Sequence, residues 1–303
     1  MTRRIGFLGL AVWILASIGA LAQGAVVGLS LSTLNNPFFV ALRDGALQAA
    51  QKAGIQLIVL DAQDRVDKQV ADIEDLIQRR VRVLLVNPTD SAAVVPAIQR
   101  ANRAGIPVIT VDRAAAGGQI AFHIASDNVA GGRMAAEYIC QQLLKGRGKV
   151  VELEGIPGTS AARDRGQGFN AYLKEKCPGI TVVARQTANF DRAQGLSVME
   201  NILQAQREID AVFAHNDEMA LGALQAIKAS GRKIPVVGFD ATPDAVKAVQ
   251  ACEMAATVAQ QPQEMGRIAV EKAVELIRGT KPPAKTQFIP VPLKLVTNSA
   301  CKW

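Results

Sequence analysis

Polar and charged side chains stand directly after short apolar runs at several places in this chain. They are Asp112 and Arg113, then Asn216, Asp240 and Gln260. A carboxylate or amide oxygen accepts a hydrogen bond from a hydroxyl, and the planar fork of an arginine donates to two adjacent oxygens. Together these groups suit a neutral polyol such as a sugar. Each of them, taken alone, could instead cap a helix or lie in a solvated loop.

Two adjacent aromatic residues belong to the same kind of junction. Residues 32–39 end an apolar run and open a helix, with Asn36 suited to the N-cap and Pro37 to the first helical position. Phe39 falls on the apolar stripe of that helix. Phe38 lies roughly 100° away from the stripe, so burial between helix and sheet does not account for it.

The second half of the chain adds an arginine and an aromatic residue. Arg165 lies near the start of a helix, and Phe190 lies just beyond an apolar run. An aromatic face would cover the C–H surface of a sugar. Asp127 and Asp217 are good N-cap candidates, and we leave both out of the predicted site.

Strands that alternate with helices would bring these residues together. Short apolar runs alternate with amphipathic stretches over residues 26–111, and the pattern restarts over residues 120–260. This predicts an α/β fold with two doubly wound Rossmann-like lobes and parallel sheets. Ligands bind at the carboxyl edge of such sheets, where the candidate residues stand. Residues 264–278 predict a long helix, whereas residues 279–292 carry four prolines and no helical period.

Composition narrows the function. The chain has 303 residues, 49% of them hydrophobic and 20% charged, which is typical of a globular protein. Its net charge of +7 is spread along the chain without a basic tract, so we expect no nucleic-acid partner. With two histidines, no Cys-x-x-Cys, no GxGxxG and no P-loop, we expect no metal site, no cofactor and no catalytic triad. Glu154 is the one glutamate at a strand end that a glycosidase could use, and it lies in a turn context.

The N-terminus predicts export. Arg3 and Arg4 precede an apolar run over residues 5–21, and Ala20-Leu21-Ala22 fits a cleavage site, so residues 1–22 are a predicted signal peptide. The alternative is that residues 5–21 remain as an uncleaved membrane anchor, but the Ala-x-Ala site favours cleavage. Export permits disulfides between the cysteines at positions 140, 177, 252 and 301.

Several short motifs, in this order and spacing, carry a family resemblance. They are STLNNPFF (32–39), NPTDS (87–91), VITVDR (108–113), HIASDN (123–128), GTSAARDRG (158–166), NDEMALGAL (216–224), VVGFD (236–240) and ATVAQ (256–260). The chain resembles periplasmic ribose-binding proteins, the soluble receptors of ABC sugar importers, from about Ala25 to Leu295.

The resemblance implies a fold and a set of sugar contacts. The fold would be that of a type I periplasmic binding protein, with lobes 23–126 plus 261–292 and 127–260 plus 293–303. A hinge would cross near residues 126–127, 260–261 and 292–293. The matching sugar contacts are Asn36, Asp112, Arg113, Arg165, Asn216, Asp240 and Gln260, with aromatic walls at Phe38, Phe39 and Phe190. Their retention implies ribose itself, without catalysis.

The resemblance also implies partners and leaves two departures to explain. A membrane permease, and also a chemoreceptor, would read the closed form of a periplasmic monomer. His215 stands where the family often has Gln, and alternation along the strand points its side chain away from Asn216 and the cleft. The cysteines are not a family feature. Because the tail would return beside the strand ending at residue 260, we hypothesise a Cys252–Cys301 disulfide, with Cys140 and Cys177 as a further candidate pair.

Other functions remain open from the sequence alone. Within the receptor class, allulose or another pentose or hexose could fit a similar set of residues. The sensor half of a LacI-type repressor would need a helix-turn-helix where this chain has a signal peptide. A secreted carbohydrate-active enzyme would need an acid/base pair placed in the cleft.

Overall fold

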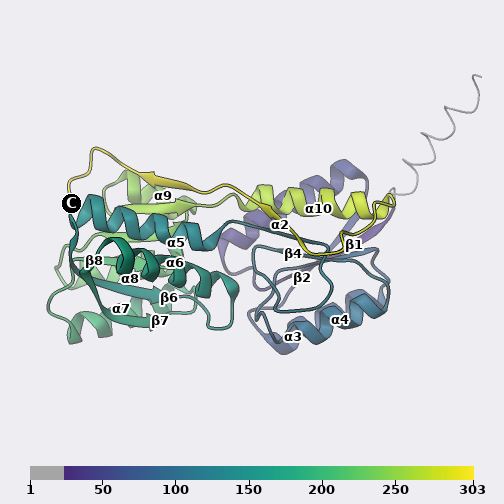
Figure 1. The fold of residues 1–303 in the computed structure, drawn as a ribbon, viewed down its shortest axis with the longest axis horizontal. Coiled ribbons are helices and arrows are strands. Elements are labelled where there is room, and N and C mark those ends of the chain that lie inside the picture. The colour runs from purple at the N-terminus through teal and green to yellow at the C-terminus, as the bar shows by residue number, and fades with distance from the viewer. Residues whose placement is uncertain (1–23) are drawn as a thin grey trace, which may run out of the picture.

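The computed structural model describes residues 24–303, so the predicted signal peptide lies outside the described residues. Two lobes lie side by side along the long axis of the molecule (Figure 1). Each lobe is built on one six-stranded sheet. The predicted pair of doubly wound α/β lobes is therefore confirmed.

The first lobe is formed mainly by the N-terminal part of the chain. Its sheet has the order β11-β5-β4-β3-β1-β2, and all of its strand pairs are parallel. The elements are β1 (Val26–Leu31), α2 (Pro37–Ala53), β2 (Gln56–Asp61), α3 (Val66–Gln78), β3 (Val83–Val86), α4 (Val95–Arg103), β4 (Val108–Val111), β5 (Phe122–Ala125), α10 (Pro262–Ile277) and β11 (Gln287–Pro290).

The second lobe repeats this architecture. Its sheet has the order β12-β10-β9-β8-β6-β7 and is parallel except for the antiparallel pair β10 and β12. The elements are α5 (Asn128–Glu137), the π-helix η1 (Tyr138–Leu143), β6 (Arg147–Glu154), α6 (Ser160–Lys176), β7 (Gly179–Thr187), α7 (Arg192–Ala205), β8 (Ala211–Ala214), α8 (Asp217–Ala229), β9 (Val236–Asp240), α9 (Pro243–Gln250), β10 (Ala256–Ala259) and β12 (Lys294–Thr297).

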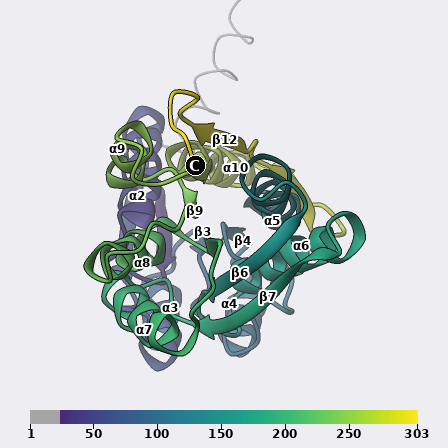
Figure 2. The ribbon, with the colours of Figure 1, turned by 90° about the vertical axis from the view of Figure 1, so that its left-hand side faces the viewer.

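Helices cover both faces of each sheet. In the first lobe, α2 and α10 pack on one face and α3 and α4 on the other, because alternate strand residues such as Leu29 and Leu84 point to opposite sides. In the second lobe, α5 and α6 lie on one side of the strands and α7 and α8 on the other (Figure 2). The strands are therefore buried on both faces, which explains their nearly continuous apolar sequences.

Close helix contacts fix the position of α6, which carries Arg165. A side-chain carbon added at Gly132 of α5 would lie 2.1 Å from the Arg165 carbonyl oxygen, and one at Gly168 would lie 2.0 Å from that of Val129. Both distances are too short for any side chain, so α5 and α6 touch backbone to backbone at these glycines. This contact sets how far Arg165 stands from the sheet.

The chain passes between the lobes three times. The crossings lie between β5 and α5, between β10 and α10, and between β11 and β12. Helix α10 consequently lies beside α2, although it is late in the sequence (Figure 1). Two disulfides, Cys140–Cys177 and Cys252–Cys301, join residues of the second lobe. Over residues 24–303, no helix combines the length and the apolar character needed to span a bilayer.

Three local predictions were incomplete. Strand β11 was missed, since residues 279–292 were read only as a proline-rich connection. The amphipathic pattern of residues 91–104 predicts one helix, but the helix begins only at Val95, because Asp90 caps a turn by accepting from the amides of Ala92 and Ala93. The pattern of residues 128–144 predicts one long helix, but this segment is α-helical only to Glu137 and then widens into the π-helix.

Candidate ligand-binding site

All of the predicted site residues line one cavity between the lobes, at the carboxyl edges of both sheets. The space that its lining residues border amounts to about 240 Å³, any part open to solvent included. Its lining residues are Asn36, Phe38, Phe39, Asp112 and Arg113 of the first lobe, and Ala161, Arg165, Phe190, Asn216, Asp240 and Gln260 of the second. Every predicted site residue is at least nine-tenths buried, so the structure is that of the closed molecule.

The junction of β1 and α2 supplies one wall. Asn36 caps α2, because its Oδ1 accepts from the amide of Phe38 at 2.9 Å. Its amide nitrogen has no hydrogen-bond acceptor among residues 24–303, which leaves that donor for a ligand. Phe38 and Phe39 meet edge to face with ring centres 5.2 Å apart. Phe38 also belongs to the first-lobe core, so the expectation that burial does not account for it was wrong in part.

The end of β4 holds Asp112 in an unusual conformation. Its φ is 63°, in the left-handed region that non-glycine residues rarely adopt. Asn87 stabilises it by donating to Val111 O at 3.0 Å and to Asp112 Oδ2 at 3.3 Å. Asn87 Oδ1 in turn accepts from the Ser32 hydroxyl at 2.6 Å. Sequence reasoning missed Asn87, although it begins one of the family motifs.

Arg113 is buried between aromatic rings of both lobes. Its guanidinium carbon lies 5.1 Å from the centre of the Phe39 ring and 5.3 Å from that of Phe190. Its Nε is 3.9 Å from Asp112 Oδ2, too far for a hydrogen bond. Among the described residues its Nη1 has one acceptor, Pro88 O at 3.4 Å. Most of its donors are therefore available to a ligand.

Arg165 is held more tightly than Arg113. Its Nε donates to Asn128 Oδ1 at 2.8 Å, and its Nη1 donates to His215 O at 2.6 Å. Its guanidinium carbon lies 3.9 Å above the centre of the Phe239 ring. Arg165 Nη1 is also 3.8 Å from Asp240 Oδ1, so each lobe contributes one arginine beside one aspartate.

Strained backbone at the end of β9 carries Asp240. Its φ is 119° and that of Ala241 is 57°. Asp217 holds this turn by accepting from Thr242 N at 2.7 Å and from Thr257 Oγ1 at 2.7 Å. Asp217 is therefore a buried support of the turn and not the N-cap that we expected.

The N-cap of α8 is Asn216. Its Oδ1 accepts from Met219 N at 3.0 Å, and its Nδ2 donates to Phe190 O at 3.1 Å. It thereby links the Phe190 turn to α8 while lining the cavity. Asp127, the other N-cap candidate, does cap α5 by accepting from the amide of Ala130.

Burial shifts the ionisable groups of the cavity. It raises the pKa of Asp112, an effect that Arg113 and Arg165 partly oppose. It raises the pKa of Asp240 well above the usual range, again opposed by Arg165. It also lowers the pKa of both arginines. Two carboxyl groups and two guanidinium groups balance one another, which suits an uncharged ligand.

Unpaired polar atoms identify what such a ligand must offer. Within residues 24–303, Asp112 Oδ1, Gln260 Oε1 and Arg113 Nε are buried without a hydrogen-bond partner. Gln260 Nε2 is already used, since it donates to Asp240 Oδ1 at 2.8 Å. The cavity thus needs both donors and acceptors from its ligand. A hydroxyl group supplies both at once.

The lobes also touch directly around this cavity. The amide of Ser91 donates to Gly158 O at 3.1 Å, and the amide of Ala114 donates to Ser160 Oγ at 2.8 Å. Both bonds join the first lobe to the loop before α6 or to its first residue. They close the molecule on the side of β3 and β4.

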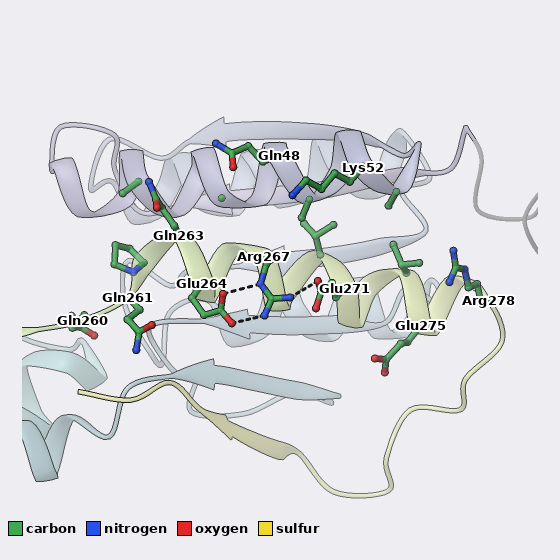
Figure 3. A pocket seen from close by; sticks show the side chains of 17 residues that line it. Gln48, Lys52, Gln260, Gln261, Gln263, Glu264, Arg267, Glu271, Glu275 and Arg278 are labelled. Atoms are coloured by element: carbon green, nitrogen blue, oxygen red, sulfur yellow. Dashed lines mark hydrogen bonds and ion pairs between the residues drawn. The ribbon is translucent and has the colours of Figure 1, made fainter. Parts of the chain in front are cut away.

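A larger groove lies elsewhere, between α2 and α10 (Figure 3). It contains about 1790 Å³ of space, much of it open to solvent. Arg267 lies between Glu264 and Glu271 and pairs with both, while Gln48 and Lys52 lie across the groove (Figure 3). Its central charges satisfy one another, unlike those of the buried cavity. Over the described range, no group of side chains has the composition of a metal site.

His215 points away from the cavity, as strand alternation predicted. It is not solvated, because both it and Glu152 are fully buried. Its Nε2 lies 2.9 Å from Glu152 Oε1.

The chain is similar in sequence and fold to known binding proteins. Residues 27–281 match a family model described as a periplasmic binding protein domain. The chain is 51% identical to the ribose import binding protein RbsB of Bacillus subtilis, over 90% of this chain and 87% of the relative. It is 49% identical to RbsB of Escherichia coli, over 98% of this chain and 99% of the relative. The solved structure of a Caulobacter myo-inositol binding protein bound to myo-inositol covers 90% of this chain and 93% of its own at 37% identity, with a TM-score of 0.85.

Proposed function

The chain belongs to the periplasmic binding protein family, and from this premise we propose that it captures D-ribose between its lobes and delivers it to the permease of an ABC transporter. The cavity carries this proposal, because its unpaired donors and acceptors are those that a small polyol would satisfy. The identity of about half to ribose import binding proteins, over nearly the whole chain, supports ribose over other sugars.

Each class of side chain has a role toward the sugar in this proposal. Asp112 and Asp240 accept from hydroxyls, while Arg113 and Arg165 donate to hydroxyl or ring oxygens. Three further amide side chains, those of Asn36, Asn216 and Gln260, complete the polar contacts. Phe38, Phe39 and Phe190 cover the C–H faces.

Binding and closure are one process in this proposal. The contacts are divided between the lobes, so only the closed molecule can make all of them. A ligand shifts the equilibrium toward the closed form by its excess affinity for that form. The three crossings between the lobes serve as the hinge.

We assign the hinge boundaries as the sequence predicts them. The first lobe comprises residues 23–126 with 261–292, and the second comprises 127–260 with 293–303. The protein acts after export, as a periplasmic monomer whose closed form the permease reads. A chemoreceptor would read the same closed form.

The competing functions receive less support. The relatives with about half of the residues identical are named for ribose import, not for allulose or a hexose. An enzyme would need an acid/base pair in the cavity, whereas Glu154 lies outside its lining and 3.8 Å from Arg185. We propose binding without catalysis.

Titration calorimetry of the ligand-free protein tests the proposal. Unfolding and refolding first removes any sugar acquired during expression. We expect tight one-to-one binding of D-ribose and much weaker binding of other pentoses, allulose, galactose and glucose. Absence of heat with ribose, together with tight binding of another sugar, would overturn the specificity.

A further inference from the structure

A buried hydrogen-bond chain connects Glu152, His215 and Gly155 behind the cavity. His215 Nε2 lies 2.9 Å from Glu152 Oε1, and the amide of Gly155 donates to His215 Nδ1 at 3.3 Å. A backbone amide can only donate, so Nδ1 must carry a lone pair. The proton of the neutral ring is therefore on Nε2, where it is donated to Glu152.

Glu152 is fixed from its other side. Asn170 Nδ2 donates to both carboxylate oxygens, at 3.1 and 2.9 Å, and Arg185 Nε donates to Oε2 at 2.7 Å. The carboxylate of this strand residue is thus fully occupied. Because it cannot turn away, it holds the His215 ring in one orientation.

Gly155 lies directly beneath the aromatic wall of the second lobe. A side-chain carbon at Gly155 would lie 2.0 Å from Cζ of Phe190, so the ring rests on the glycine backbone. Phe190 itself has a φ of 58° and is not held by regular secondary structure. The position of Gly155 therefore sets the position of the Phe190 ring in the cavity.

The same histidine supports two other cavity residues. Its carbonyl oxygen accepts from Arg165 Nη1 at 2.6 Å. The next residue, Asn216, donates to Phe190 O at 3.1 Å. His215 thus does not line the cavity, but it bonds to Arg165, precedes Asn216 in the chain and supports Phe190 through Gly155.

We propose that His215 is a positioning residue that holds the Phe190 wall and Arg165 in place only while its ring is neutral, so that protonation of this ring weakens ligand binding. The inference rests on the proposed sugar-binding function. A second proton would sit on Nδ1 and face the Gly155 amide, replacing a hydrogen bond by two opposed N–H groups. The loop under Phe190 would then have to move.

The surrounding charges act in both directions. Glu152 on β6 favours the protonated ring, whereas Arg165 on α6 disfavours it and Arg185 on β7 neutralises part of the Glu152 charge. Glu154, on the same strand as Glu152, lies 3.8 Å from Arg185. Within residues 24–303 the Gly155 amide has His215 Nδ1 as its acceptor and no other, so this contact favours the neutral ring.

Linkage gives the sign and the limit of the effect. If the bound form resists the second proton more than the free form does, ligand binding and protonation of the ring oppose each other. Affinity is then greatest while the ring is neutral and falls as the pH drops. For one proton the loss is at most about tenfold per pH unit.

The test compares the wild type with His215→Gln and His215→Leu by ribose titration at pH 7.5 and 5.5. A glutamine amide offers an acceptor oxygen and a donor NH2 group, as the neutral imidazole offers an acceptor and a donor nitrogen, but it does not titrate in this range. We expect H215Q to bind at pH 7.5 within about threefold of the wild type and H215L to bind about tenfold more weakly, the effect of one lost hydrogen bond. Asp112 and Asp240 contribute equally to the pH profile of all three proteins, so the difference between profiles belongs to position 215.

The expected result is a larger acid loss of affinity in the wild type than in H215Q. Nitrogen NMR of the ligand-bound wild type should also find Nδ1 unprotonated and Nε2 protonated. Identical pH profiles for wild type and H215Q, or undiminished binding by H215L, would refute the inference. A wild type that binds no ribose at either pH would instead refute the proposed function.

Discussion

Replacing Arg113 by alanine should weaken ribose binding more than almost any other single change. The side chain is 3% exposed and lies between Phe39 and Phe190. Its one hydrogen bond within the protein is the 3.4 Å contact to Pro88 O, and Nε has no partner in the described part of the chain. Its hydrogen-bonding capacity is therefore directed at the ligand.

The magnitude follows from two charge-assisted hydrogen bonds. A hydrogen bond to a charged group contributes about 1.5–3 kcal/mol, and the guanidinium fork can make two with adjacent oxygens. Their loss corresponds to about 3–6 kcal/mol, or roughly a hundred- to ten-thousandfold in affinity. Arg113→Lys retains the charge without the fork and should fall between the alanine variant and the wild type.

Calorimetry and thermal unfolding measure this effect independently. A hundredfold loss of affinity removes about 2.7 kcal/mol of ligand-induced stabilisation at a saturating ribose concentration. Arg100→Ala is the matched control, because Arg100 lies on α4 of the same lobe and pairs with Glu74 at the surface. We expect that control to bind ribose as the wild type does. Ribose affinity of R113A within threefold of the wild type would remove Arg113 from the site.

Two further predictions concern stability. The Cys252–Cys301 disulfide spans 49 residues, so C252S/C301S should lower the free energy of unfolding, measured in urea, by about 4 kcal/mol. Ribose affinity should not change, because neither cysteine lines the cavity. An unchanged urea midpoint would contradict the first expectation. Burial raises the pKa of Asp217 to about 7, so the folded protein retains a proton that the unfolded chain releases near pH 4. The free energy of unfolding should therefore decrease as the pH rises from about 4 to 7, and D217N should make this decrease smaller. Urea titrations at several pH values would measure both proteins. An equally large decrease in D217N would exclude Asp217 as its source.

Residues at strand ends were predictable because their signal is local. An apolar run followed by Asp112 or Asp240 indicates both the end of a strand and a carboxylate at that end. Parallel strands share one carboxyl edge, so the sequence also implied that these side chains converge. The structure does place these side chains in one cavity. Predicting this needed only the fold class and no knowledge of contacts between distant residues.

The supporting residues could not be predicted in the same way. Asn87, Asp217 and Glu152 act through partners on other strands, and nothing in their own neighbourhood names those partners. Strand β11 escaped notice for a related reason. It is short and contains Pro290, and it is recognisable as a strand only through its parallel pairing with β5.

The charges of the cavity explain why a ligand is needed to hold the lobes together. Each arginine lies beside the aspartate of its own lobe, Arg113 by Asp112 at 3.9 Å and Arg165 by Asp240 at 3.8 Å. Across the cleft, the attraction of each arginine for the opposite aspartate is opposed by repulsion between the two arginines and between the two aspartates.

Two neutral pairs therefore face each other with little net attraction between them. Within the part of the chain that the structure describes, the direct bonds between lobes, such as Ser91 to Gly158, are few and neutral. Closure without ligand would also bury Asp112 Oδ1 and Gln260 Oε1 unpaired, at a cost of about 1–3 kcal/mol for each group. A sugar removes that cost and connects the lobes through its own hydroxyls, so an uncharged polyol can control closure of a cleft lined with four charges.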